Sequence, residues 1–306
     1  MTVDVQYREL LKYILTNGRM HEDPNRIGTH RLNVPSYIFQ VPIDSVPAVS
    51  IKKSFPSLAM KELSLFMRGV TDIRAFWEVG VHFWDKDWYN FNGHKNKADL
   101  LDIKENPHRY DHFELGKIYP YQYRNFGGSF DQMERLLYKM INRPMDSAIM
   151  VSAWSPSDEK EMSLTPCHHE FVVAMEKLGT FSNGYGFHLS WMQHSVDTFL
   201  GLPMNIMYYY YLGKILERVT GHKFLSLTGH LFNVHLYDNS VELAKDVINN
   251  RPKHIHKTSQ LEFSSYFEKE LVDYKDFWDN LPLDAVKLSG YESYRHYPCE
   301  MKPYNK

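Results

Sequence analysis

Cys167 has the strongest nucleophilic potential of any side chain in this 306-residue sequence, which contains one other cysteine. It lies in residues 164–170 (LTPCHHE), directly after Pro166 and before two histidines. A thiolate is a soft, strong nucleophile when a nearby cation or hydrogen-bond donors lower the pKa of the thiol. A free cysteine is otherwise a small buried apolar residue. The local sequence leaves both interpretations open.

The run from Cys167 to Glu170 also contains residue types that bind metals. Neighbours in an extended segment point to opposite faces, so four consecutive residues cannot surround one ion. His94, His108 and His112 have spacings that match no standard zinc site. The sequence therefore predicts no metal centre.

Hydrophobic periodicity predicts the elements that must position Cys167. Helices are expected over 4–17, from Pro56 to Gly69, and over 130–141, 204–219 and 240–249. Strands are expected over 32–42, 47–52, 148–154, 170–176, 184–192 and 224–236. The polar stretch from His21 to Arg31 indicates a loop. Strands and helices mix without regular βαβ alternation, which favours an α+β fold with a mixed sheet packed against helices.

Composition indicates a globular chain with 43% hydrophobic and 24% charged residues, which we interpret as one domain over residues 1–306. A polar segment at about 89–114 is expected to be a small insertion. The net charge of −2 gives no general attraction to nucleic acid or to an anionic membrane. We expect a cytoplasmic protein, because there are only two cysteines and no signal peptide or membrane-spanning apolar run. Cys299 is expected to have no role.

Several segments, collinear from residue 5 to about 240, resemble the motifs of thymidylate synthases. They are RIGT at 26–29, KK at 52–53 with Glu62, FWDKDW at 83–88, LGKIYPYQYR at 115–124, VSAW at 151–154, LTPCH at 164–168, QHSVDTFLGLPMNI at 193–206 and HLY at 235–237. Collinear matches over most of a chain are far more specific than any single motif.

The resemblance implies that Cys167 adds to C6 of a pyrimidine and makes C5 nucleophilic. Asn205 resembles the amide that bonds N3 and O4 of uracil, because it offers one donor and one acceptor. Glu62, Tyr119 and His168 resemble the proton-handling network around C5 and O4. With Asp197, these form the expected catalytic set.

The resemblance also implies how the two substrates are held. Asp197 would bind the folate's pterin through its N–H groups. The expected folate contacts are Lys52, Trp84, Leu164, Asp197 and Gly201. The expected nucleotide contacts are Arg26, Gln193, His194, Ser195, Asn205, His235 and Tyr237, with His235 and Tyr237 at the 3′-hydroxyl of the sugar.

Three of the four arginines by which the family grips the 5′-phosphate are missing from this sequence. Arg26 matches the first, and His194 stands at the second. An adjacent pair, lent by the other subunit, is expected where Ser147 and Ala148 stand. A phosphate carries a charge of about −2. An arginine binds it through two parallel hydrogen bonds and a fixed positive charge, whereas a histidine compensates only part of the charge at neutral pH. Arg124, Arg143 or segment 89–114 are the candidate replacements.

The reaction that the resemblance implies is reductive methylation of a uracil nucleotide, dUMP to dTMP being expected. 5,10-Methylenetetrahydrofolate would be the co-substrate that supplies both carbon and hydride, without a metal. A homodimer that packs sheet against sheet is the expected assembly.

Three alternatives remain open. The first is a nucleotide 5-hydroxymethylase of the same family, in which water replaces hydride, although Trp84 favours methylation. The second is a family member that acts on a uracil compound with a different 5′ group. The third is a non-enzyme, either an RNA-binding protein or a structural dimer, and the near-zero net charge gives RNA binding no support.

Overall fold

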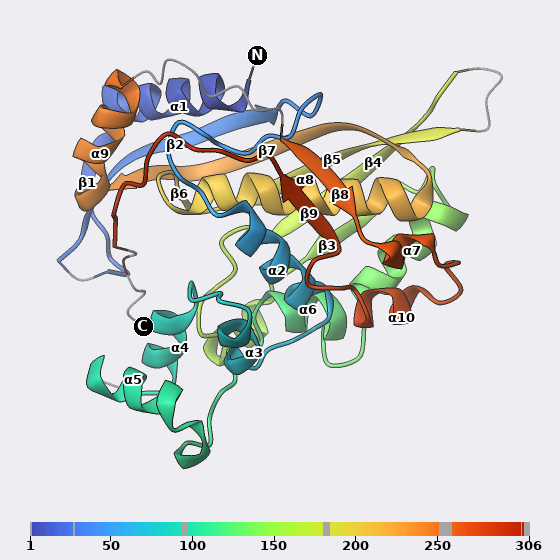
Figure 1. Ribbon diagram of the computed structural model, residues 1–306, viewed down its shortest axis with the longest axis horizontal. Helices are drawn as coiled ribbons and strands as arrows, with labels where there is room; N and C mark the ends of the chain where they lie inside the picture. The colour runs from blue at the N-terminus through green and yellow to red at the C-terminus, as the bar shows by residue number, and fades with distance from the viewer. Residues whose placement is uncertain are drawn as a thin grey trace.

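The computed structural model describes residues 2–26, 28–93, 97–179, 184–250, 259–300 and 302. These ranges form an α+β fold, as the mixed strand and helix pattern predicts (Figure 1). The strands are β1 (Arg19–Glu22), β2 (His30–Val41), β3 (Met150–Ser152), β4 (Glu170–Lys177), β5 (Tyr185–Gln193), β6 (Val196–Asp197), β7 (Lys223–Tyr237), β8 (Gln260–Phe263) and β9 (Val286–Ser289). The α-helices are α1 (Val3–Asn17), α2 (Pro56–Met67), α3 (Ile73–Glu78), α4 (Asp85–Phe91), α5 (Lys97–Glu105), α6 (Tyr119–Asn125), α7 (Gln132–Asn142), α8 (Gly201–Thr220), α9 (Asp238–Asn249) and α10 (Tyr274–Asp279).

The main sheet has the strand order β1-β2-β7-β5-β4-β3, with β6 paired to β7 as well. Strands β5 and β6 run parallel to β7, and the remaining pairs are antiparallel. Parallel neighbours end at the same edge of a sheet. Gln193 at the end of β5 is therefore brought to the same edge as Asp197 and His235, which are paired across β6 and β7.

Helix α8 lies along one face of the sheet, and α2 and α6 lie beyond it on the same side (Figure 1). The apolar side chains of α8 are buried along most of its length, and Gly221 ends the helix in the left-handed conformation, as expected. Helices α1 and α9 pack together beside β2. None of the helices in the described ranges is long and apolar enough to cross a membrane.

Gly229 of β7 makes room for the ring that joins the sheet to α8. A Cβ built at Gly229 would lie 2.4 Å from Trp191 of β5. The indole of Trp191 stacks on Tyr209 of α8, with ring centroids 5.1 Å apart. A larger residue at position 229 would displace this stack, since a packed core has no spare volume.

The expected helices correspond to α1, α2, α7, α8 and α9, and most expected strands to β2, β3, β4, β5 and β7, with shifted ends. The strand predicted over 47–52 is wrong, since these residues belong to no strand. Its apolar pattern reflects burial of Val49 and Ile51, while the amide N–H groups of Ser50 and Ile51 donate to Asp4. The loop predicted over 21–31 is shorter, because its ends extend β1 and β2.

The polar segment at 89–114 contains the end of α4 and all of α5. Ile103 is fully buried, and the ammonium of Lys104 lies 2.5 Å from the carboxylate of Asp85. These contacts attach α5 to the start of α4. The interpretation of this segment as an insertion into a single domain stays a prediction.

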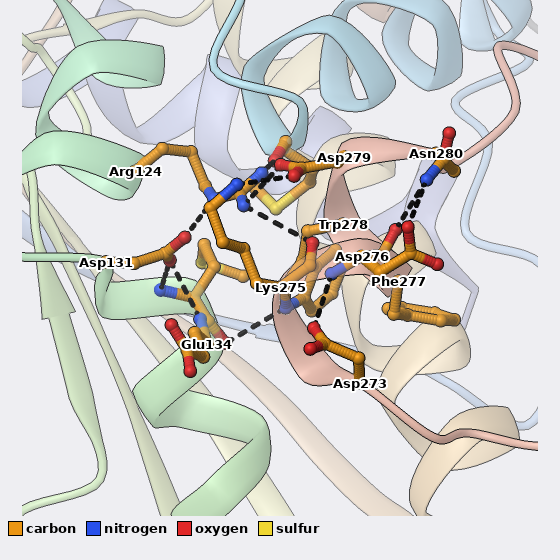
Figure 2. Close-up of polar contacts among 12 residues, drawn as sticks. Arg124, Asp131, Glu134, Asp273, Lys275, Asp276, Phe277, Trp278, Asp279 and Asn280 are labelled. Atoms are coloured by element: carbon orange, nitrogen blue, oxygen red, sulfur yellow. Dashed lines mark hydrogen bonds and ion pairs between the residues drawn. The ribbon is translucent and has the colours of Figure 1, made fainter.

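Arg124 ties α6 to the elements around it (Figure 2). Its side chain is 7% exposed, its Nε lies 2.8 Å from Asp131, and its Nη2 lies 2.7 Å from Asp279 of α10. It also donates to the carbonyl of Met67 at the end of α2. The carboxylate of Asp131 also caps α7, because it accepts hydrogen bonds from the backbone amides of Met133 and Glu134. Arg124 is therefore a structural ion-pair centre, and the expectation that it replaces a phosphate-binding arginine is wrong.

We expect Arg124→Gln to lower the free energy of unfolding by about 3 kcal/mol, because it leaves the buried Asp131 carboxylate without its cation. Urea unfolding at neutral pH measures the change. Lys275→Gln removes a cation that is 58% exposed and pairs with the same Asp279, so it should cost less than about 1 kcal/mol. Equal losses in the two variants would contradict a special role for Arg124.

Candidate functional site

A cavity of about 560 Å³ opens at the edge of the sheet where β5, β6 and β7 end. Every site residue predicted from the sequence lines it, with the exception of His194. The walls come from α2, α6, the segment before β4, the start of α8 and the C-terminal segment. Residues far apart in sequence are thus brought to one surface.

Cys167 lies partly buried in this wall. Burial raises the pKa of its thiol to about 11, the positive charge of Arg26 lowers it, and the carboxylates of Asp87 and Asp197 raise it further. The carbonyl of Cys167 accepts a 2.9 Å hydrogen bond from the amide of His194. Arg26 is thus the cation that favours the thiolate, the nucleophilic form.

Glu62 of α2 also lines the cavity. Burial raises the pKa of its carboxyl to about 7, although the Trp84 hydrogen bond lowers it. That bond joins Trp84 Nε1 to Glu62 Oε1 at 2.8 Å. A carboxyl with a pKa near the working pH can both give and take a proton, which general acid–base chemistry requires.

His168 and Tyr119 form a stacked pair between Cys167 and α8. Their ring centroids are 4.3 Å apart, and the amide of His168 donates to the hydroxyl of Tyr119 at 3.2 Å. The Nδ1 of His168 lies 2.9 Å from the hydroxyl of Tyr209. Burial lowers the pKa of His168 to about 3, so the imidazole is neutral at physiological pH. It can donate a hydrogen bond from one ring nitrogen and accept one at the other without carrying charge.

Gln193 sets the orientation of the Asn205 amide. Its Nε2 donates to Asn205 Oδ1 at 3.2 Å and to the carbonyl of Ser195 at 3.1 Å. The Oε1 of Gln193 is held by Trp191 Nε1 at 3.2 Å. Because Asn205 Oδ1 faces Gln193, the N–H donors of Asn205 can serve a ligand carbonyl oxygen.

Asp197 is the last residue of β6, and its Oδ1 accepts from the amides of Phe199 and Leu200, just before α8, at 3.0 Å each. Burial raises its pKa, while these bonds and the charge of Lys52 lower it. Lys52 is 4% exposed and lies 4.8 Å from the ring of Phe199. Burial lowers the pKa of Lys52 to about 8. Asp197 and Lys52 thus offer the cavity a hydrogen-bond acceptor and a cation. Leu164 and Gly201 also line the cavity.

His235 and Tyr237 at the end of β7 lie beside Arg26. The Nδ1 of His235 donates to the carbonyl of Asn233 at 2.6 Å, and its buried Nε2 has no hydrogen-bond partner. Burial lowers its pKa to about 4, so this Nε2 is an acceptor for a ligand hydroxyl. The guanidinium of Arg26 lies 5.3 Å from the Tyr237 ring and 3.4 Å from the buried carboxylate of Asp23.

His194 is the predicted residue that the structure does not bring into the cavity wall. Its ring packs against Trp154 and His169, with centroid distances of 5.3 and 5.5 Å. Burial lowers its pKa, and the neighbouring His169 lowers it further. His194 therefore provides no positive charge at neutral pH in place of an arginine.

The structure adds residues that sequence reasoning missed. Cys299 and Tyr297 line the cavity from the C-terminal segment. The expectation that Cys299 has no role stays a prediction. The amide of Lys53 donates to the carbonyl of Arg295 at 2.7 Å, which fixes this segment over the opening. No local pattern signals these contacts, since they join residues more than 200 positions apart.

The described part of the chain contains no group of three or more histidine, cysteine, aspartate or glutamate side chains that could hold a metal ion. His94 lies outside the described residues.

Comparison with known proteins points to one family. The thymidylate synthase family model matches residues 5–302. The chain belongs to the thymidylate synthase family. The thymidylate synthase of Saccharomyces cerevisiae is 28% identical over 287 residues, which cover 89% of each chain. That of Mycoplasma genitalium is 30% identical over 251 residues, 78% of this chain and 83% of its own.

A probable thymidylate synthase of Schizosaccharomyces pombe is 28% identical over 321 aligned residues, which include 98% of this chain and 47% of that protein. This chain thus spans about half of that relative. The mixed sheet packed against helices is consistent with the thymidylate synthase fold.

Glu62→Gln should change how stability depends on pH. The folded-state pKa of Glu62, about 7, lies above its ordinary value of 4.5. The folded protein therefore binds the extra proton between these values, and the wild type loses stability relative to the variant as pH rises through this window. The difference should reach about 3 kcal/mol above neutral pH.

Thermal or urea unfolding at pH values of about 5 and 8 measures this difference. The control is Glu242→Gln, which replaces a carboxyl that is 79% exposed and should give no comparable trend. A Glu62→Gln difference that is constant with pH would show that Glu62 is not held protonated by burial.

Proposed function

We propose that the protein transfers a one-carbon unit to C5 of a uracil nucleotide, converting dUMP to dTMP. The observation that carries this proposal is the meeting of Cys167, Glu62 and Asn205 in one cavity wall. A thiol, a carboxyl that titrates near neutrality and an oriented amide are the three groups that C5 substitution of uracil requires.

Cys167 supplies the nucleophile for C6 of the ring, and addition there moves electron density to C5 and O4. Asn205 Nδ2 donates to O4, since its Oδ1 is already engaged by Gln193. Glu62 and the neutral His168 hold or deliver the protons that O4 and C5 exchange. The buried Nε2 of His235 accepts from the 3′-hydroxyl of the sugar.

A folate co-substrate would contact Asp197, Trp84 and Lys52 of the same cavity. Asp197 offers a carboxylate for pterin N–H groups, Trp84 offers an indole wall held by Glu62, and Lys52 offers a cation for the glutamate tail. 5,10-Methylenetetrahydrofolate supplies the carbon and the hydride in this chemistry.

A dimer through the outer face of the sheet is part of the proposal. Ile38 of β2 is 63% exposed and Phe232 of β7 is 45% exposed, and they lie two residues apart in the register of these strands. Trp154, at 39% exposure, follows β3 at the far edge. Burial of these side chains against a second copy would remove apolar surface from water. We also place the protein in the cytoplasm, where its two free thiols stay reduced.

The decisive experiment follows release of tritium from C5 of labelled dUMP in the presence of methylenetetrahydrofolate. We expect release, with dTMP and dihydrofolate as products, and no release above background for Cys167→Ser. A hydroxymethylated product with tetrahydrofolate would identify the hydroxymethylase instead. Retention of the label by both dUMP and deoxyuridine would contradict the proposal and favour a binding or structural role.

His194→Arg tests how the 5′-phosphate is held. An arginine at this position adds a fixed cation next to Ser195, so we expect KM for dUMP to fall about 10-fold. His194→Gln is the matched control, because it adds no charge. Turnover of deoxyuridine, which lacks the phosphate, should not improve in either variant. If dUMP binding also fails to improve with arginine, the phosphate lies elsewhere or is not part of the substrate.

A further inference from the structure

Helix α1 contacts the turn before α8 through the hydroxyl of Tyr7. This hydroxyl donates a 2.9 Å hydrogen bond to the carbonyl of Thr198, 191 positions along the chain, and lies 3.5 Å from the carbonyl of Phe199. Tyr7 is fully buried. Burial raises its pKa, and the negative charges of Asp197 and Asp4 raise it further, so the hydroxyl keeps its proton and remains a donor.

The backbone that Tyr7 contacts is the turn that holds Asp197. The peptide group that joins Thr198 to Phe199 accepts from Tyr7 at its carbonyl. Its N–H donates to Asp197 Oδ1 at 3.0 Å, and the amide of Leu200 donates to the same oxygen at 3.0 Å. Hydrogen bonds at both ends of one peptide group polarise it and strengthen each other. With Oδ1 engaged by two amides, Oδ2 is the oxygen of Asp197 that can accept from a ligand in the cavity.

Asp4, one turn before Tyr7 on α1, holds a second segment of the cavity wall. Its Oδ1 accepts from the amide of Ser50 at 2.7 Å and from that of Ile51 at 3.3 Å, and its Oδ2 accepts from the Ser50 hydroxyl. Lys52 follows directly in the sequence and lines the cavity. One helix thus contacts both backbone segments from which Asp197 and Lys52 reach the cavity.

We propose that α1 positions the two charged groups that a folate would contact, Tyr7 acting on Asp197 and Asp4 acting on Lys52. The inference rests on the proposed function, in which Asp197 accepts from pterin N–H groups and Lys52 pairs with the glutamate tail. Tyr7 and Asp4 do not line the cavity themselves, so both are positioning residues that act through the side chains they hold.

The turn that holds Asp197 is also tied to the sheet. The amide of Thr198 donates to the carbonyl of His235 on β7 at 2.9 Å. Loss of the Tyr7 hydroxyl therefore loosens the turn without releasing it from β7, and His235 keeps its place in the strand. The effect should fall on the folate rather than on the nucleotide.

Tyr211 and Glu9 provide matched controls. Tyr211 of α8 is fully buried, and its hydroxyl has no hydrogen-bond partner in the described part of the chain. Tyr211→Phe therefore makes the same chemical change as Tyr7→Phe without removing a hydrogen bond from the turn. Glu9 lies on α1 with Asp4, but its side chain is 56% exposed and pairs with Lys12. Glu9→Gln thus removes a carboxylate from the same helix without affecting residues 50–52.

The first test compares the Michaelis constants of the two substrates. We expect Tyr7→Phe to raise KM for methylenetetrahydrofolate about 10-fold, because one well-placed hydrogen bond is lost, and to leave KM for dUMP within twofold of the wild type. Tyr211→Phe should change neither constant. An equal rise of both constants in Tyr7→Phe, or the same rise in Tyr211→Phe, would leave Tyr7 only a packing role and overturn the inference.

A tetrahydropterin without the glutamate tail separates the two contacts. Its binding to the protein with dUMP bound is measured by calorimetry, beside that of tetrahydrofolate. Tyr7→Phe should weaken both ligands about 10-fold, whereas Asp4→Asn should weaken only tetrahydrofolate, since the pterin has no tail for Lys52. Glu9→Gln should weaken neither ligand. Equal weakening of both ligands by Asp4→Asn would contradict the role assigned to Asp4.

Amide hydrogen exchange tests the geometry without turnover. We expect the amides of Phe199 and Leu200 to exchange about 10-fold faster in Tyr7→Phe than in the wild type or in Tyr211→Phe. Unchanged exchange in Tyr7→Phe would overturn the inference whatever the kinetics show. If the wild type turns over no uracil substrate and binds no folate, the proposed function fails, and the exchange rates still decide whether Tyr7 holds the turn of Asp197.

Discussion

The stack of Trp191 on Tyr209 is the contact on which the rest of the site depends. It joins the sheet to α8 at the point where Gly229 leaves space for the indole. The same two residues also hold side chains that line the cavity. Trp191 fixes Gln193, which orients Asn205, and Tyr209 fixes His168. A single layer of core packing therefore sets the orientation of the groups that face the ring of a substrate.

Burial acts on the ionisable groups of the cavity in opposite directions. It raises the pKa of Glu62 to about 7 and that of Cys167 to about 11, and it lowers that of His168 to about 3 and that of His235 to about 4. Loss of water disfavours the charged form of each group. As a result the histidines are neutral hydrogen-bonding groups, while Glu62 is the carboxyl that can exchange a proton near pH 7. The group with a pKa near neutral pH in this cavity is thus the carboxyl of Glu62, whereas His168 and His235 have pKa values of about 3 and 4.

The positive charges available to a 5′-phosphate differ from the set of arginines that the family resemblance implies. Arg26 shares its charge with the buried Asp23, His194 is neutral, and Arg124 belongs to a separate ion-pair centre with Asp131 and Asp279. The cavity nevertheless contains other cations, among them Lys52.

The sequence by itself determined the fold class and the family. Hydrophobic periodicity predicted α1, α2, α7, α8 and α9, because each buries one apolar face, and the collinear motifs contain the predicted site residues that line the cavity. It failed over 47–52, where β-branched residues are buried without forming a strand. An alternating apolar pattern indicates that side chains are buried, but it does not indicate whether the backbone pairs with another strand.

Only the tertiary structure decided which groups carry charge and which neighbours they have. In the folded chain His194 does not line the cavity, Arg124 pairs with Asp131, and Cys299 lines the cavity. These outcomes depend on desolvation and on contacts between residues far apart in the chain. Neither is encoded in local spacing, because both arise only when the helices and the sheet have packed.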